Sequence, residues 1–230
     1  MKDLVSSQEK DTNNITAESI LRCPSCHAGE PLSLANDELR CPACNANFPA
    51  DPTHGFYALL APTSESSEKA NIQAWWGDLY KQLYEEHEHS LTRDSLPENL
   101  KDLEEMFRLR EHLAVVEMPL DEIEGRHVLE IGPGGGGHSA LFQSKGARVT
   151  AADLTPERVV GTAIKLGLSD RGDGRAYQAD AENLPFHDAT FDIVYSNGVL
   201  HHSQNTDRCI AEVMRVLKPG GRAILMLYSR

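Results

Sequence analysis

The stretch VLEIGPGGGG at residues 128–137 constrains the fold of this chain more than any other feature. An apolar run long enough for a buried strand leads directly into a glycine-rich turn, and a helix-length segment follows the turn. Glycines adopt backbone angles that other residues avoid, and they let a ligand approach the main chain closely. The N-terminus of the following helix favours a carboxylate or phosphate group. The stretch therefore predicts a ligand-binding strand–turn–helix unit.

Strands and helices alternate through the rest of this region. Apolar runs predict strands at 127–131, 148–152, 175–179, 191–196 and 222–228. Helix-length segments lie between them at 137–145, 155–166 and 207–217, and KPGG at 218–221 is a stop signal for the last helix. Alternating strands and helices fold into a parallel sheet with helices on both faces. We therefore expect an α/β fold over 125–230, with a doubly wound, Rossmann-like and mostly parallel sheet.

The glycine spacing alone leaves the identity of the ligand open. Gly132, Gly134 and Gly137 satisfy the dinucleotide-binding pattern G-x-G-x-x-G. With Gly136 in place of Gly137, the same turn satisfies E-x-G-x-G-x-G, which resembles the first motif of class I S-adenosylmethionine-dependent methyltransferases. Asp153, at the end of the second expected strand, suits the ribose hydroxyls of either cofactor.

Three later segments favour the methyltransferase family. DAENLPF at 180–186, FDIVYSN at 191–197 and VLHH at 199–202 closely resemble the consecutive motifs of small-molecule class I methyltransferases, and LKPGG at 217–221 completes the series. The resemblance covers about residues 126–230. The family normally adds a helix and an antiparallel strand pair after its fifth strand, whereas this sequence stops at Arg230. We therefore expect either a longer native chain or a domain that lacks its last strands.

The resemblance also implies the roles of individual residues. The methionine end of S-adenosylmethionine is expected at Glu130 and the glycine turn, its ribose at Asp153, and its adenine at Asp180. His202 is the candidate base for the methyl acceptor, and the alternative is that it only shapes the cofactor pocket. The full set of expected cofactor-binding residues is Glu130, Gly132, Gly134, Gly136, Asp153, Leu154, Asp180, Ala181 and Asn197.

Four of the five cysteines form two Cys-Pro-x-Cys pairs, separated by fourteen residues. Each Cys-x-x-Cys turn can place two thiolates on one ion, and four thiolates complete the tetrahedral site that zinc prefers. A segment of ~40 residues buries too little core to fold alone, so the metal supplies stability. We expect a structural Zn²⁺ on Cys23, Cys26, Cys41 and Cys44. The alternative is four ordinary buried thiols or a redox pair.

The sequence around these cysteines, residues 20–61, resembles the zinc-ribbon proteins that activate tRNA and release-factor methyltransferases as a partner subunit. A zinc ribbon also precedes the methyltransferase domain of a bacterial ribosomal-RNA guanine methyltransferase.

Between 68 and 118, apolar residues recur at three- and four-residue steps, which predicts helices. The expected organisation is a disordered tail (1–19), a zinc ribbon (20–61), a linker and helical cap segment (62–124) and a truncated methyltransferase domain (125–230).

Charge and hydropathy weigh against some classes of substrate and location. The formal net charge is −13, and residues 61–124 carry −10 of it, whereas residues 125–230 carry +1. Nucleic-acid binders usually show a basic stripe, and none is visible here, which weighs against nucleic-acid substrates. No apolar run approaches the ~18–20 residues of a membrane span. The polar start MKDLVSSQEKDTNNIT lacks the apolar core of a signal peptide, so we expect a cytoplasmic protein.

These observations predict an S-adenosylmethionine-dependent methyltransferase that acts on a small metabolite, lipid or glycan intermediate by in-line methyl transfer. One alternative is an RNA or protein methyltransferase that uses the zinc ribbon to recognise its substrate. A second alternative is a non-catalytic module that binds the cofactor. Residues 223–227 of the last expected strand are all apolar. An exposed edge strand of this kind predicts self-association.

Overall fold

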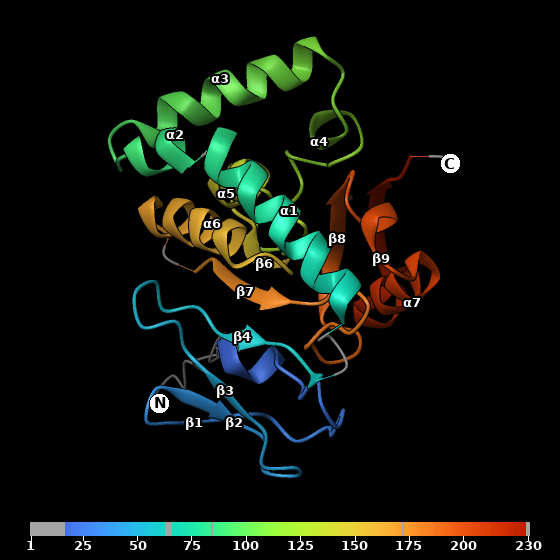
Figure 1. Cartoon of the computed structure of the whole chain (residues 1–230). Helices are drawn as coiled ribbons and strands as arrows, with labels where there is room; N and C mark the ends of the chain where they lie inside the picture. The colour runs from blue at the N-terminus through green and yellow to red at the C-terminus, as the bar shows by residue number, and fades with distance from the viewer. Residues whose placement is uncertain (1–16, 63–65, 84, 172, 229–230) are drawn as a thin grey trace, which may run out of the picture.

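The computed structural model describes residues 17–62, 66–83, 85–171 and 173–228 (Figure 1). Most of the tail expected at 1–19, and the centre of the linker that follows residue 62, lie outside the described residues. Among the helices that the structure describes, none combines the length and the apolar character needed to cross a membrane.

A fully parallel sheet forms the centre of the described chain. Within the described residues it has six strands in the order β4-β7-β6-β5-β8-β9. They are β4 (Ala58–Leu59), β5 (His127–Ile131), β6 (Arg148–Asp153), β7 (Arg175–Ala179), β8 (Phe191–Asn197) and β9 (Leu217–Met226). Consecutive side chains of a strand point to opposite faces, so Leu129 and Ile131 pack in one core and Val128 in another. The expected Rossmann-like α/β sheet is confirmed.

Helices cover both faces of this sheet. Three follow the strands as expected, namely α5 (Gly137–Ser144), α6 (Pro156–Leu168) and α7 (Thr206–Val216). The segment before β5 forms α1 (Ser67–Leu83), α2 (Glu85–Ser90), α3 (Leu96–Leu109) and α4 (Leu113–Val116), and short 3₁₀ helices lie at η1 (Ala17–Ile20) and η3 (Leu200–His202). In Figure 1, α1 crosses in front of the sheet beside α6, and α3 lies above α5.

The last strand differs from its expected bounds. We expected a strand at 222–228 after a separate KPGG turn, but β9 begins at Leu217 and ends at Met226. Phe191 pairs with Leu217 and Ile193 pairs with Arg222, so residues 218–221 bulge out of the ladder. Gly220, with a φ of +77°, allows this bulge, which brings Lys218 Nζ within 2.8 Å of Asp192 Oδ1. The stop signal thus ends helix α7 without separating it from the strand.

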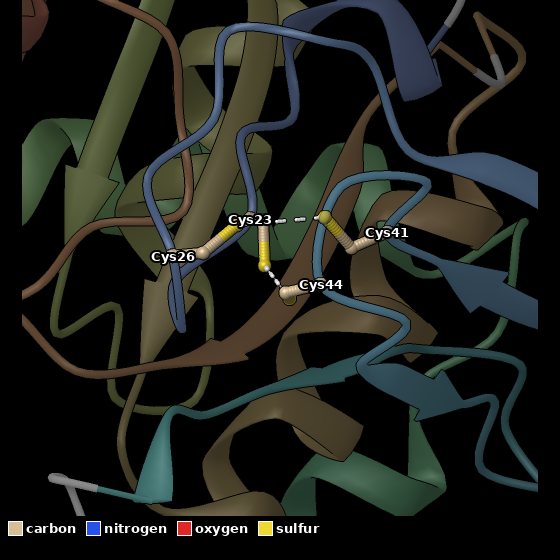
Figure 2. A group of neighbouring side chains, drawn as sticks. All are labelled: Cys23, Cys26, Cys41 and Cys44. Carbon is tan, nitrogen blue, oxygen red and sulfur yellow. Dashed lines mark hydrogen bonds between the residues drawn. The ribbon is translucent and has the colours of Figure 1, made fainter.

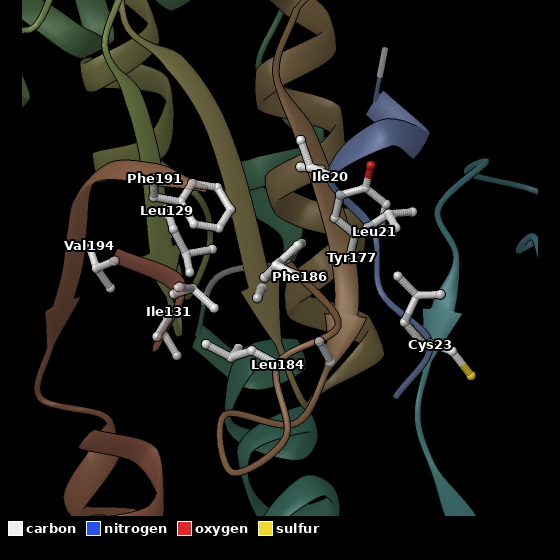
Figure 3. Packing of buried hydrophobic residues seen from close by; sticks show 14 of the residues in the cluster. Ile20, Leu21, Cys23, Leu129, Ile131, Tyr177, Leu184, Phe186, Phe191 and Val194 are labelled. Atoms are coloured by element: carbon white, nitrogen blue, oxygen red, sulfur yellow. The ribbon is translucent and has the colours of Figure 1, made fainter. Parts of the chain in front are cut away.

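The cysteine segment is built into the same fold. Its strands β1 (Ser33–Ala35), β2 (Glu38–Arg40) and β3 (Asn47–Pro49) form a small antiparallel sheet. The next strand, β4, pairs in parallel with β7 and so becomes an edge of the large sheet. Leu21 also forms an antiparallel bridge to Phe186. Figure 3 shows Ile20 and Leu21 packed beside Tyr177 and Phe186 in one continuous core. Residues 20–61 therefore share their core with the α/β sheet.

Candidate functional site

The glycine turn between β5 and α5 has the conformation that its sequence requires. Gly132, Gly134 and Gly136 have φ values of +72°, +59° and +80°. A Cβ at Gly132 would overlap the side chain of Val199, and one at Gly136 would lie 2.7 Å from Thr162 Cα. Only glycine fits these positions without strain, and the turn therefore presents bare backbone beside α6 and the loop after β8.

Two adjoining cavities lie where the parallel strands end. One has a volume of about 770 Å³ and the other about 80 Å³, and both are lined by Gly132, Asp153 and His202. The larger cavity extends from the glycine turn to α3 and the loop before α4, and the smaller one extends to the ends of β6 and β7. Ligands of open α/β sheets bind at this carboxyl edge, so its position is that of a binding site.

Most of the expected site residues line these cavities. The larger one contains Gly132, Gly134, Asp153, Asn197 and His202, and the smaller one contains Leu154, Asp180 and Ala181. Glu130 and Gly136 lie behind the turn and outside both linings. Glu130 is buried, accepts a hydrogen bond from Ser139 Oγ at 2.5 Å and lies 3.2 Å from His138 Nδ1. In this structure Glu130 therefore anchors the start of α5.

Asp153 places a carboxyl group at the junction of the two cavities. Its Oδ1 accepts the backbone N–H of Thr155 at 2.8 Å. Burial raises the pKa of Asp153 to about 6, although this hydrogen bond and the charge of Arg158 oppose the shift. At pH 7 the group is mainly ionised and can accept hydrogen bonds from ligand hydroxyls.

Asp180 belongs to a buried ion cluster. Lys69 Nζ, from α1, lies 2.5 Å from Asp180 Oδ2 and 3.2 Å from Glu182 Oε2. Burial alone would lower the pKa of Lys69, but its hydrogen bonds and its attraction to these two carboxylates outweigh burial and raise it. Lys69 was not predicted from the sequence. Its partner Asp180 lies 111 positions away, and the residues around Lys69 in the chain do not show that the two will meet.

Helix α1 makes further contacts along the same edge. Gln73 Nε2 donates to the backbone oxygen of Leu154 at 2.7 Å. The ring of Trp76 lies 4.8 Å from Arg158 Cζ and edge-on to His202 at 5.1 Å. Lys69, Gln73 and Trp76 are spaced by three and four residues, so they share one helix face. That face covers the ends of β6 and β7.

The far wall of the larger cavity comes from α3 and the loop before α4. Phe107 stacks on His112 at 4.3 Å between ring centroids, and Leu103 and Met106 add apolar surface. His112 Nδ1 accepts the backbone N–H of Ala114 at 3.1 Å, and its Nε2 lies 3.2 Å from Nδ2 of Asn197. Burial, with a smaller contribution from a neighbouring histidine, lowers the pKa of His112 and favours its neutral form. The sequence offered no signal for His112.

The four cysteines form a second candidate site, shown in Figure 2. All four Sγ atoms lie within 4.8 Å of one another, with Cys23–Cys44 at 3.7 Å and Cys26–Cys41 at 3.6 Å. A tetrahedral zinc with Zn–S bonds of about 2.3 Å requires sulfur separations of about 3.8 Å.

The two cysteine turns also have matching backbones. His27 donates its N–H to Cys23 O and Asn45 donates to Cys41 O, each at 2.9 Å. His27 and Asn45, which follow the second cysteine of each pair, have φ values of 59° and 60°. Two similar turns gather the four thiols within 4.8 Å of one another, which fits a structural metal and confirms that the expected cluster assembles.

Comparisons with known proteins find a family match within the C-terminal half of the chain. Residues 129–225 match the family described as "Methyltransferase domain". The chain is 37% identical over 109 residues to sterol 4-C-methyltransferase strm-1 of Caenorhabditis elegans, covering 46% of this chain and 32% of that protein. It is 36% identical over 110 residues to demethylmenaquinone methyltransferase of Thermobifida fusca, covering 48% and 47%. The chain thus spans less than half the length of these curated relatives.

Among solved structures, the YcgJ protein of Bacillus subtilis is 33% identical. The match covers 49% of each chain with a TM-score of 0.43.

Proposed function

Starting from a methyltransferase domain over residues 129–225, we propose that this chain binds S-adenosylmethionine and transfers its methyl group to a small-molecule acceptor. The observation that carries the proposal is the arrangement at the sheet edge. The glycine turn after β5, Asp153 at the end of β6 and Asp180 after β7 line two adjoining cavities. This order suits an elongated ligand with an amino-acid end, a ribose and a purine.

The chain's own residues supply binding and alignment. The bare backbone at Gly132 and Gly134 faces the methionine end, Asp153 accepts the ribose hydroxyls, and Asp180 with Ala181 holds the adenine. Bound S-adenosylmethionine supplies an electrophilic methyl group on a sulfonium. Because such a group needs little acid–base assistance, holding the acceptor in line provides most of the rate enhancement.

A small, partly apolar acceptor fits the larger cavity. Leu103, Met106 and Phe107 give it an apolar wall, while His112 and Asn197 place polar groups beside the glycine turn. Two relatives are named for methylation of a sterol and of demethylmenaquinone, which supports an acceptor of the same size class.

A base for a protonated acceptor is proposed at His202, which lines both cavities. His112 is the weaker candidate for this role. Both of its ring nitrogens already lie within hydrogen-bond distance of protein groups, Nδ1 of the Ala114 N–H and Nε2 of Asn197 Nδ2.

We further propose that Cys23, Cys26, Cys41 and Cys44 hold one Zn²⁺, and that residues 20–61 are a zinc ribbon fused in cis to the catalytic domain. The sulfur separations and the paired turns support zinc over a disulfide, and the five cysteines of the described chain are all free. The ion would fix the two cysteine turns and take no part in methyl transfer.

The test combines binding with transfer. Purified protein is titrated with S-adenosylhomocysteine in a calorimeter, then incubated with fractionated cell extract and S-adenosylmethionine labelled in its methyl group. Binding together with label in small molecules is the expected result. Label in RNA or protein would show that the acceptor is a macromolecule and not a small molecule. Binding without any transfer would point to a non-catalytic cofactor-binding module. Absence of binding would refute the proposal.

A further inference from the structure

We propose that Lys69 is a positioning residue of the purine subsite, which holds Asp180 as a carboxylate and so makes the site require a 6-amino purine. The inference rests on the proposed function and deepens it. Lys69 belongs to α1, outside the matched methyltransferase domain. The specificity of the subsite would then depend on a helix that the family match does not include.

The buried ion cluster carries this inference. Lys69 is 7% exposed, Asp180 4% and Glu182 7%, and all three line the smaller cavity. Two carboxylates buried close together repel one another, and a buried charge is costly unless a charge of opposite sign pairs with it. Lys69 lies within hydrogen-bond distance of both, at 2.5 and 3.2 Å, and balances one of the two negative charges.

The contacts of Asp180 fix its orientation as well as its charge. Its Oδ1 accepts the backbone N–H of Glu182 at 2.9 Å, and its Oδ2 accepts from Lys69. An ionised carboxylate offers about four acceptor sites and no donor. It can therefore hold the amino group of adenine, whereas the oxygen of a 6-oxo purine would meet another acceptor. The discrimination therefore depends on Asp180 presenting acceptors alone, which its pairing with Lys69 supports.

The N-terminus of α1 is held in place on both sides of Lys69. The backbone N–H of Lys69 donates to Ser66 Oγ at 3.1 Å. Gln204, from the loop before α7, donates to Ser66 Oγ at 3.0 Å and to Glu68 Oε2 at 2.9 Å. Further along the helix, Gln73 bonds to Leu154 O. The ammonium group of Lys69 therefore projects from a helix fixed to the loops that form the purine subsite.

The experiment compares Lys69→Met with Lys81→Met. Lys81 lies on the same helix and pairs with Glu157 at 2.8 Å, but it is half-exposed and outside both cavities. Calorimetry measures the affinity of each protein for S-adenosylhomocysteine and for its 6-oxo counterpart, S-inosylhomocysteine. Wild type and K81M should prefer the adenine form by about tenfold or more, as expected for a hydrogen bond to a charged group. K69M should bind the adenine form about tenfold more weakly and lose most of the preference.

A second pair of variants guards against a K69M protein that does not fold. E182Q and K69M/E182Q are compared in the same way, because the double variant restores the net charge of the wild-type cluster. The double variant should prefer S-adenosylhomocysteine over S-inosylhomocysteine less strongly than E182Q does. Lys69→Arg keeps the positive charge and should keep the wild-type preference. Wild-type discrimination in either folded protein that lacks Lys69 would overturn the inference. A wild-type chain that binds neither ligand would instead overturn the proposed function.

Discussion

At Asp153, the proposed role in ligand binding opposes the stability of the folded protein. Its pKa is raised to about 6 in the folded protein, above the ordinary value of 3.8, chiefly by burial. The folded state therefore binds this proton more tightly than the unfolded chain does, and the ionised carboxylate destabilises the folded protein at pH 7. A ligand that donates hydroxyl hydrogen bonds to the carboxylate recovers that energy, because it stabilises the charged form.

Asp153→Asn should therefore separate the two effects. The affinity of the wild type for S-adenosylhomocysteine should fall as the pH drops through about 6, because ligand binding requires the ionised carboxylate. D153N should bind about tenfold or more weakly at pH 7 and lose this part of the pH dependence, while its Tm at pH 7 should equal or exceed that of the wild type. Calorimetry and thermal unfolding between pH 5 and 8 measure both. Unchanged affinity in a folded D153N protein would exclude Asp153 from the site.

Strand β9 forms one edge of the large sheet in the described part of the chain. Among the described residues it pairs with β8 alone, so its other edge presents backbone N–H and C=O groups. Ile224 is buried, whereas Ala223 is exposed, and Arg222 is held at the rim by Glu117 at 3.3 Å. An unpaired edge of this kind invites pairing with another chain unless a charge or proline blocks it.

We therefore expect the 230-residue chain to self-associate through β9. Light scattering over a range of concentrations should show dimers or larger species, and Ala223→Lys should shift the protein towards monomer by adding a charge to the edge. Arg40→Ala, on the distant strand β2, serves as the control and should leave the distribution unchanged. A monomeric wild type at all concentrations would contradict this prediction.

Across the whole molecule, the cysteine segment and the cavities are connected through one core. Cys23 and Cys41 are buried in the same cluster as Leu129 and Phe186. The backbone oxygen of Pro24, next to Cys23, accepts a hydrogen bond from Asn183 Nδ2 at 2.8 Å. Asn183 in turn donates its backbone N–H to Asp180 O at 2.9 Å, so two hydrogen bonds link a cysteine turn to Asp180 in the proposed purine subsite.

Loss of the metal should for this reason affect ligand binding as well as stability. Purified protein should contain about one zinc per chain. Cys26→Ser, or removal of the ion by a chelator, should lower the Tm and weaken binding of S-adenosylhomocysteine, because the turn that supports Asn183 is released. Cys209→Ser changes a buried thiol outside the cluster and should retain the metal. A metal-free protein with an unchanged Tm and affinity would show that the cysteine segment is independent.

The sequence by itself determined the local units of this protein. The strand and glycine turn at 128–137, and the two Cys-Pro-x-Cys turns, are specified by residues that are neighbours in the chain, so backbone sterics and spacing suffice to predict them. The polar residues Asp153 and Asp180 could be placed for the same reason, because parallel strands end at one edge.

Only the tertiary structure decided what lies opposite these units. Lys69 meets Asp180, His112 meets Asn197, and β4 pairs with β7 through contacts that span tens of residues or more. No local pattern encodes such a pairing, because it depends on which helix face and which sheet edge the packed core leaves available. The contacts of Glu130 with Ser139 and His138 likewise depend on how α5 packs against β5.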